Sequence, residues 1–420
     1  MVVKQCRFQL NSWLYFIALT LLLAGCGDTA VASEILDTQL TFEQPVVSEL
    51  PTPAAYRIGI NTEVTGTGAQ IGDLSIRAAR LAIEEINGAG GVNGVPLELV
   101  VRDARSDPAT ALAQYRQAVA EDDLDALLGP FKSAYGVLIV PEHKQSTLPM
   151  FIGATNATLT QQGAEHLFRM RPSDRLTAPA MLALTLEHLR AKRIGLVHDT
   201  DAFGSGGADT IEADLAQLGQ EPAVRLGYAT GTTDFDSLVR RLAAARVDAV
   251  LIYGTNQTDV GHLLRAIRYR DLDVPVVTSP SGSSVVTRNV AAEAQDSIYV
   301  VLDALLTLSP GGQRFLQAFE SRFGLQPDTY IAWYYDAVHL LTGIWREHPQ
   351  AAGPELSRLI RAANFEGAQG QYCFDATGEG LHQVVLAQMR NGLPQPIGIY
   401  GESGLDMTPP TAAGCGQEQP

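Results

Sequence analysis

The sequence has little that would support metal, redox or hydrolytic chemistry. Only four cysteines occur in 420 residues, and the eight histidines form neither an H-x-H nor an H-E-x-x-H pattern. No G-x-S-x-G motif is present. The segment LGPFKS (128–133) ends like a phosphate-binding P-loop, but Ala126 and Phe131 stand where that motif needs glycine. We therefore expect no metal, no cofactor and no enzymatic activity.

Positive charge is also scarce. The chain has 30 Lys and Arg against 46 Asp and Glu, which gives a formal net charge of −16. A surface this acidic repels nucleic acid and anionic membrane surfaces, so neither is expected as a partner.

Long apolar runs are missing except near the start. Lys4 and Arg7 precede an apolar segment, 13–24, that is too short to span a bilayer comfortably. It ends in LAGC (23–26), which resembles the bacterial lipobox, in which the cysteine becomes the lipidated first residue. We expect residues 1–25 to be a signal peptide and Cys26 to carry lipid. The protein would then be exported and anchored to a bacterial membrane, facing the periplasm or the outside. An ordinary signal peptide with a chance cysteine is the alternative.

Residues 26–55 contain few aromatics and end in prolines, so we interpret them as a disordered tether.

Few cysteines remain in the mature chain. Cys6 leaves with the signal peptide, and only Cys373 and Cys415 are left in an oxidising compartment. A disulfide between them would join the C-terminal tail, 404–420, to the body, but sequence cannot show that their Cα atoms come close enough.

A glycine-rich turn follows the first strand pattern. In EVTGTGAQIGD (63–73), Gly66, Gly68 and Gly72 are spaced G-x-G-x-x-x-G rather than G-x-G-x-x-G. The acidic residue expected about 20 residues later is also missing, since Asp103 comes too late. This argues against a nucleotide and favours either a carboxylate at a helix N-terminus or a simple tight turn.

Strand and helix patterns alternate along the chain. Ile76, Ala79, Ile83 and Ile86 share one face of the first helix, which follows the strand YRIGIN (56–61). The alternation continues to residue 172 and restarts after MRPSD (170–174), with helices expected at 175–190, 207–218, 235–245 and 259–270. Two successive βαβ series predict an α/β fold of two doubly wound lobes with parallel sheets. Ligands bind such sheets at the carboxyl ends of the strands.

An ordered set of segments resembles one family. YRIGINTEVTGTGAQIGDLSIRAARLAIEEINGAGGVNGVPLELVV, LLGPFKSAYG, RIGLVHDTDAFGSG, TDFDSLVRRL, DAVLIYG and TYIAWYYDAVHLL are similar, in this order, to the type I periplasmic binding proteins. The likeness is to the branched-chain amino-acid (Leu/Ile/Val) group that serves ABC transporters, and it covers residues 56 to 400.

The resemblance implies a domain organisation and a function. Lobe 1 would comprise 56–172 and 300–383, and lobe 2 would comprise 173–299 and 384–403, with crossings near 173, 299 and 384. A monomer would capture a small polar ligand, an amino acid, carboxylic acid or amide, between the lobes and deliver it to the permease subunits of an ABC importer. The alternative is a periplasmic ligand-sensing subunit of a signalling receptor.

The resemblance also implies a site, and the chain departs from it in places. By position, the ligand carboxylate would be held by Ser133, Gly153, Ala154 and Thr155, with Gly66 in a wall of the cleft and Phe203 as an aromatic contact. Lys132 would favour a negative charge or be a solvated surface residue. Three positions differ from the family pattern: Ile71 and Asn256 replace aromatics, and Ser281 replaces the acidic partner of the ligand ammonium.

The change at Ser281 leads to a hypothesis about the ligand. A buried ammonium without a charged partner costs several kcal/mol, more than one hydroxyl offsets. We therefore expect a carboxylic acid, hydroxy acid or amide rather than a branched-chain amino acid, unless Asp174 or Asp201 turns into the cleft.

Overall fold

A computed structural model describes residues 54–410 of the protein. The predicted lipidation site Cys26, most of the predicted tether and Cys415 lie outside these residues. Within residues 54–410, no helix is both long and apolar enough to cross a membrane.

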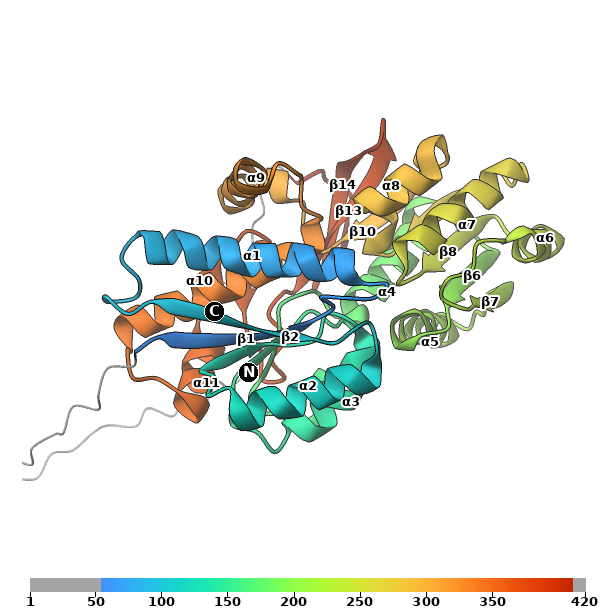
Figure 1. Ribbon diagram of the computed structural model, residues 1–420. Helices are drawn as coiled ribbons and strands as arrows, with labels where there is room; N and C mark the ends of the chain where they lie inside the picture. The colour runs from blue at the N-terminus through green and yellow to red at the C-terminus, as the bar shows by residue number, and fades with distance from the viewer. Residues whose placement is uncertain (1–53, 411–420) are drawn as a thin grey trace, which may run out of the picture. The chain divides into compact units, whose positions relative to one another are not determined.

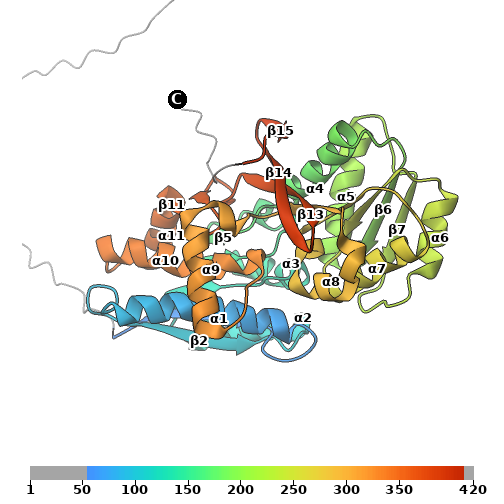
Figure 2. The same ribbon diagram turned by 90° about the horizontal axis from the view of Figure 1, so that it is seen from above.

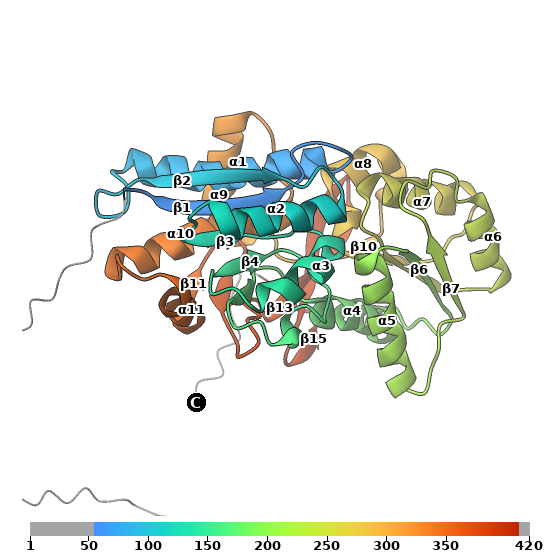
Figure 3. The same cartoon turned by 60° about the horizontal axis from the view of Figure 1, so that its bottom comes forward.

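The first sheet has five parallel strands in the order β2-β1-β3-β4-β5. These strands are β1 (Tyr56–Thr62), β2 (Leu97–Asp103), β3 (Ala126–Leu128), β4 (Met150–Ile152) and β5 (Leu167–Arg169). Helices α1 (Ala69–Gly88) and α10 (Ala332–Glu347) cover one face, and α2 (Pro108–Glu121) and α3 (Ser133–His143) cover the other (Figure 1, Figure 3). The apolar face predicted for α1 is confirmed, because Ile76, Ala79, Ile83 and Ile86 are all buried.

The second sheet has eight strands in the order β15-β14-β13-β10-β9-β8-β6-β7. Its parallel part is β6 (Ile194–Asp199), β7 (Val224–Tyr228), β8 (Ala249–Tyr253), β9 (Val276–Thr278) and β10 (Tyr299–Leu302). An antiparallel edge, β13 (Gln383–Arg390), β14 (Leu393–Gly401) and β15 (Gly404–Asp406), extends it beyond the predicted parallel sheet (Figure 2).

Four helices of the second sheet lie where the periodicity places them, with shifted ends, and the pattern did not predict a fifth at 285–291. The helices are α4 (Asp174–Ala183), α5 (Ala202–Gln217), α6 (Asp236–Ala244), α7 (Gln257–Tyr269) and α8 (Val285–Ala291). Helix α5 begins five residues before its predicted start at 207, because Asp201 accepts the first free backbone N–H groups at its N-terminus. Helix α4 ends early, and a π-helical turn over Leu184–His188 completes the predicted segment.

Three segments connect the two sheets: 170–173 before α4, 303–309 after β10, and 374–382 before β13. Between the last two, α9 (Pro310–Phe323), α10, α11 (Gly353–Ala362) and the hairpin of β11 (Asn364–Glu366) and β12 (Gln371–Cys373) form. Phe315, Phe319, Trp333 and Trp345 from this part belong to the same apolar core as β1 and α1. β10 pairs with β9, so the chain leaves the second sheet after Leu302 rather than at 299.

Both halves are therefore doubly wound α/β units, as predicted. The lobe boundaries remain a proposal, with the second crossing moved to 303.

Candidate ligand-binding site

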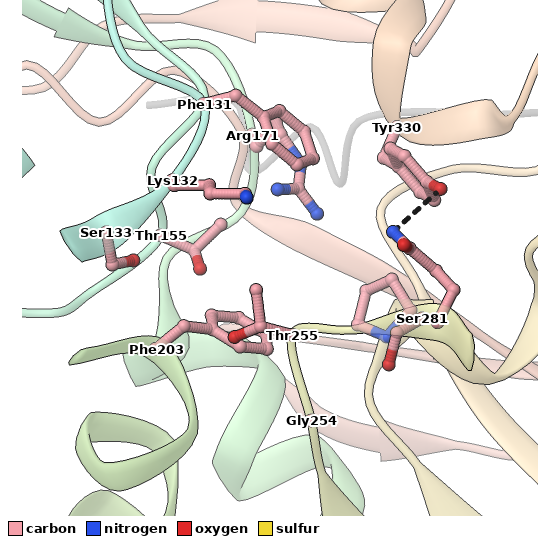
Figure 4. Close-up of a pocket in the computed structure, with 12 residues that line it drawn as sticks. Phe131, Lys132, Ser133, Thr155, Arg171, Phe203, Gly254, Thr255, Ser281 and Tyr330 are labelled. Carbon is pink, nitrogen blue, oxygen red and sulfur yellow. Dashed lines mark hydrogen bonds between the residues drawn. The ribbon is translucent and has the colours of Figure 1, made fainter. Parts of the chain in front are cut away.

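A cavity lies beyond the carboxyl ends of strands from both sheets. It encloses about 410 Å³ of non-atom space, part of it open to solvent. Its lining residues follow β3 and β4 in the first sheet and β6, β8 and β9 in the second, with one more from the connecting segment 170–173 and one from the turn before α10 (Figure 4). They are Phe131, Lys132, Ser133, Thr155, Arg171, Phe203, Gly254, Thr255, Gln257, Pro280, Ser281 and Tyr330. Four residues predicted for the site therefore come together here: Ser133, Thr155, Phe203 and Ser281.

The first-sheet wall, Phe131, Lys132, Ser133 and Thr155, offers unpaired donors. Ser133 is the first residue of α3, and the residue before it, Lys132, gives the helix no side-chain cap. The Ser133 hydroxyl oxygen accepts the Asn156 N–H at 3.2 Å, which leaves its own hydrogen for a ligand. Thr155 is buried; its hydroxyl lies beside the carboxyl of Asp174, with which it interacts, and it forms no regular hydrogen bond within residues 54–410. An uncapped helix N-terminus beside two such hydroxyls favours an anion.

Lys132 is neither solvated nor unpaired. Its side chain is only 20% exposed, and its ammonium donates to Glu63 at 2.8 Å. The Tyr135 hydroxyl donates to the same carboxylate at 2.7 Å. Because Glu63 lies behind the lysine and does not line the cavity, it fixes the ammonium at the cavity edge, where Figure 4 shows it pointing inward.

Arg171 is a lining residue that the sequence patterns did not reveal. It lies in the segment between β5 and α4 and is 5% exposed. Its guanidinium pairs with buried Asp303, with Nε 2.5 Å from one carboxylate oxygen, and donates through Nη1 to the carbonyl of Gly153 at 3.1 Å. The guanidinium carbon also lies 4.9 Å from the ring centre of Phe131 and 5.6 Å from that of Tyr330. The ion pair thus joins two of the segments that connect the sheets.

The second-sheet wall, Phe203, Gly254, Thr255, Gln257, Pro280 and Ser281, satisfies its own polar groups. Asp201 caps α5 by accepting from the N–H groups of Phe203 and Gly204, at 2.9 and 2.8 Å. The other Asp201 oxygen accepts from the Thr255 hydroxyl at 2.7 Å. The Ser281 hydroxyl is 3.1 Å from that of Ser279. This wall presents an aromatic ring, a proline and neutral polar groups to the cavity.

A buried carboxyl lies behind this wall. Asp199, at the end of β6, is fully buried and accepts the Asp201 N–H at 2.8 Å. Burial, and secondly the charge of Asp201, raise the pKa of Asp199 well above its usual range. These contacts give the two aspartates cap and turn roles.

Four other residues predicted for the site do not line the cavity. Gly66 adopts φ +92° and packs against Ser106. Gly153 leaves no room for a side chain, because a Cβ would come within 2.6 Å of the indole of Trp333. The carbonyl of Ala154 accepts from the buried guanidinium of Arg169. Asn256 caps α7 by accepting from the N–H groups of Thr258 and Asp259, at 2.9 and 3.3 Å.

Asp174 stays behind the cavity. It is 1% exposed, and one of its oxygens accepts from the Tyr253 hydroxyl at 2.7 Å. Burial raises its pKa to about 6, which the hydrogen bond from Tyr253 and the neighbouring Thr155 hydroxyl partly oppose. Its second carboxylate oxygen has no partner among the described residues.

Other features of the described residues add little chemistry. Over residues 54–410, no group of three or more His, Cys, Asp or Glu side chains is arranged to hold a metal ion. Cys373 is exposed, and its predicted partner Cys415 lies outside this range, so the disulfide stays a prediction.

Comparison with known proteins identifies the family. The profile described as "Periplasmic binding protein" matches residues 55–393. The chain belongs to this family. Within it, this periplasmic binding protein is of type I, and its relatives include binding proteins of branched-chain amino-acid transport, as its motifs indicated.

Three relatives of this periplasmic binding protein show how far the similarity extends. Two are from Pseudomonas aeruginosa: an "Amino acid binding protein", 29% identical, and a "Leucine-, isoleucine-, valine-, threonine-, and alanine-binding protein", 27% identical; each alignment covers 77% of this chain and 86% of the relative. The structure also resembles the branched-chain amino acid transporter substrate binding protein LivJ from Streptococcus pneumoniae, solved with isoleucine. That likeness has a TM-score of 0.74 and 25% identity, and it covers 81% of this chain and 98% of LivJ.

These comparisons establish the general role. This periplasmic binding protein is a solute-binding component of ABC transport rather than an enzyme, and its family is exported to the periplasm or cell surface.

Proposed function

We propose that this protein is a lipid-anchored receptor that captures a small carboxylate lacking an α-ammonium group and delivers it to an ABC importer. The charge of the cavity lining carries this proposal. Among the described lining residues, the only charged side chains are Lys132 and Arg171, and both are cations.

The first-sheet wall suits a carboxylate. The Ser133 hydroxyl, the Thr155 hydroxyl, the uncapped start of α3 and the Lys132 ammonium all face the same cavity. Donors preorganised in this way bind a carboxylate through charge-assisted hydrogen bonds, each stronger than a bond between neutral groups.

An ammonium group finds no charged partner in the lining. Ser281 offers one hydroxyl, which it shares with Ser279. Asp201, considered above as a substitute, uses both oxygens to hold α5 and Thr255. Asp174 retains one unpartnered oxygen but is buried outside the lining. The relatives named above bind amino acids, so amino acids are the competing ligand class.

Anchoring and delivery complete the proposal. Lipid on Cys26 would hold the protein at a membrane, since each buried methylene contributes about 0.8 kcal/mol. We propose that the protein acts as a monomer, with residues from both sheets lining the cavity.

Calorimetry on refolded, ligand-free protein tests the ligand class. Leucine is compared with 4-methylpentanoate, which has the same carbon skeleton without the amine, and with the corresponding 2-hydroxy acid. We expect the two acids to bind more tightly than leucine, and Ser281→Glu to strengthen leucine binding by restoring a counter-charge. Submicromolar binding of leucine or valine that persists in Asp174→Asn and Asp201→Asn would contradict the proposal.

Fractionation and uptake test the anchor and the delivery step. Cys26→Ser should move the protein from the membrane to the soluble fraction or leave its signal peptide uncleaved. Deleting the gene should abolish uptake of the radiolabelled ligand. Loss of a transcriptional or motile response with normal uptake would instead favour a sensory subunit.

A further inference from the structure

The guanidinium of Arg171 is held in place by its neighbours, but not all of its N–H donors form hydrogen bonds. A guanidinium has five N–H donors in a planar fork. Asp303 accepts from Nε and Nη2, at 2.5 and 3.3 Å, and the carbonyl of Gly153 accepts from Nη1 at 3.1 Å. These three bonds leave one N–H on each terminal nitrogen without a partner among the described residues.

The unused edge of the fork faces the cavity. Figure 4 shows both terminal nitrogens of Arg171 pointing into the open space between Thr155 and Ser281. Arg171 is 5% exposed, and the rings of Phe131 and Tyr330 lie against its guanidinium. Phe131 and Tyr330 also line the cavity, so the fork cannot rotate away without losing both the rings and Asp303.

A second buried arginine provides the contrast. Arg169, two residues earlier, is fully buried and does not line the cavity. It pairs with Glu379 and donates to the carbonyls of Ala154 and Asn156. Arg169 therefore serves the fold with both of its terminal nitrogens, whereas Arg171 keeps an edge directed at the ligand space.

We infer that Arg171 forms a second recognition subsite, and that the ligand carries a planar oxygen acceptor in addition to its carboxylate. This deepens the proposed function and depends on it: the carboxylate binds at Ser133 and Thr155, and a carbonyl, amide or second carboxylate oxygen accepts from the two free N–H groups of Arg171. A carbonyl oxygen can accept from both N–H groups through its two lone pairs, and a carboxylate can accept one bond on each oxygen.

The local charges bear on which acceptor is preferred. Arg171 is neutralised by Asp303, and Lys132 by Glu63. The subsite is thus formally neutral, and an uncharged carbonyl meets its hydrogen bonds without adding a second negative charge to a protein of net charge −16. Oxo acids and amide acids are the expected class, and dicarboxylates are the variant to be compared.

Calorimetry with matched ligands tests this. The ligands form a series of roughly four to seven carbons that grows by about one methylene per step. At each length, the plain monocarboxylate is compared with the oxo acid and the dicarboxylate. We expect at least one oxo acid to bind about tenfold more tightly than its plain counterpart, because a lost bond to a charged group costs about that factor. If a dicarboxylate binds more tightly than the oxo acid of the same length, the group that accepts from Arg171 is a second carboxylate instead.

Two double variants separate the subsite from the fold. Arg171→Met with Asp303→Asn removes a whole ion pair, so no buried charge is left unpaired, and should abolish the preference while plain acids still bind. Arg169→Met with Glu379→Gln removes the neighbouring pair and should retain the preference. If the first variant does not fold, Arg171→Lys keeps the charge for Asp303 but loses the fork, and should reduce the preference.

The outcomes are distinct. Plain acids binding as tightly as oxo acids and dicarboxylates at every length would overturn the inference and leave the carboxylate site standing. An Arg171→Met/Asp303→Asn protein, or a folded Arg171→Lys protein, that keeps the full preference would also overturn it. Binding of no carboxylate at all would instead defeat the proposed function.

Discussion

The two walls of the cavity both place helix N-termini beside the ligand space, but they treat them differently. In the second-sheet wall, Asp201 and Asn256 cap α5 and α7 with their own side chains. In the first-sheet wall, α3 begins at Ser133 without a side-chain cap. A capped helix has already satisfied its donors, whereas an uncapped one still has them available. The first wall is therefore built to bind the anion, and the second to close over it with apolar and neutral groups.

The positively charged lining residues also differ between the two walls. Lys132 and Arg171 approach the cavity from the first sheet and its connecting segment, and each is backed by a carboxylate that the cavity does not reach. The second wall contributes no charged lining residue among those described. Its carboxylates, Asp199 and Asp201, face inward to its own backbone.

The largest expected effect is on stability and comes from removing the charge of a buried carboxylate. In the Arg171–Asp303 pair the side chains are 6% and 1% exposed. Asp303→Asn leaves a buried cation without its partner, so we expect a loss of about 3–5 kcal/mol in the free energy of unfolding. Urea denaturation monitored by circular dichroism measures it. Glu63→Gln is the control: Lys132 is 20% exposed and can recover water, so its loss should be clearly smaller. Equal losses would show that burial does not distinguish the two cations.

The pH dependence of stability should differ in sign between two buried groups outside the lining, His143 in the first half and Asp199 in the second. His143, at the other end of α3, is buried with its Nδ1 3.0 Å from the Tyr115 hydroxyl, and burial lowers its pKa to about 4. The unfolded chain takes up a proton near pH 6.5 and the folded one does not, so stability is lost as the pH falls from about 6.5 to 4. The shift corresponds to roughly 3 kcal/mol. His143→Gln should remove this component from urea titrations between pH 4 and 7.

Asp199 should change stability with pH in the opposite direction to His143. Its folded pKa is raised, so the unfolded chain ionises first as the pH rises above about 4, and stability is lost toward neutral pH. Asp199→Asn should therefore make the protein more stable at pH 7 relative to pH 4 than wild type is. A wild-type profile that neither variant changes would mean that these groups are solvated.

Sequence patterns located the fold and much of the cavity, and they failed where contacts are distant. The βαβ alternation predicted the two sheets, and the family resemblance assigned Ser133, Thr155, Phe203 and Ser281 to the site; all four line one cavity. Nothing local marks Arg171, because its partner Asp303 is 132 residues away.

Two of the residues that do not line the cavity have other local roles. The family resemblance places Gly66 in the cleft wall, whereas in the structure its loop packs on Ser106. Asn256 was placed there by its position in the family pattern, whereas its side chain caps α7, a role that depends on the backbone around it.

A smaller effect is expected on affinity. Ser133→Ala and Thr155→Ala each remove a hydroxyl that would bond a carboxylate, which costs about 1.5–3 kcal/mol, or roughly ten- to a hundredfold in Kd. Calorimetry with the acid identified above measures the change. Ser281→Ala, in the opposite wall, is the matched control and should change Kd much less. If both first-wall variants bind like wild type, the carboxylate is held elsewhere.

The smallest effect should come from the caps of the second wall, and it should appear in stability rather than in binding. The Asn256 side chain accepts from two backbone N–H groups of α7 and does not line the cavity. Asn256→Ala leaves those groups without a side-chain partner, so we expect the free energy of unfolding to fall by about 1 kcal/mol. Asn256→Asp keeps an accepting oxygen, places its charge at a helix N-terminus and should retain the stability. Both variants should bind the acid with nearly wild-type Kd, because the ligand's bonds come from the other wall. A tenfold weaker Kd in Asn256→Ala with unchanged unfolding would mean that the asparagine contacts the ligand directly, and the division between a binding wall and a closing wall would then be wrong.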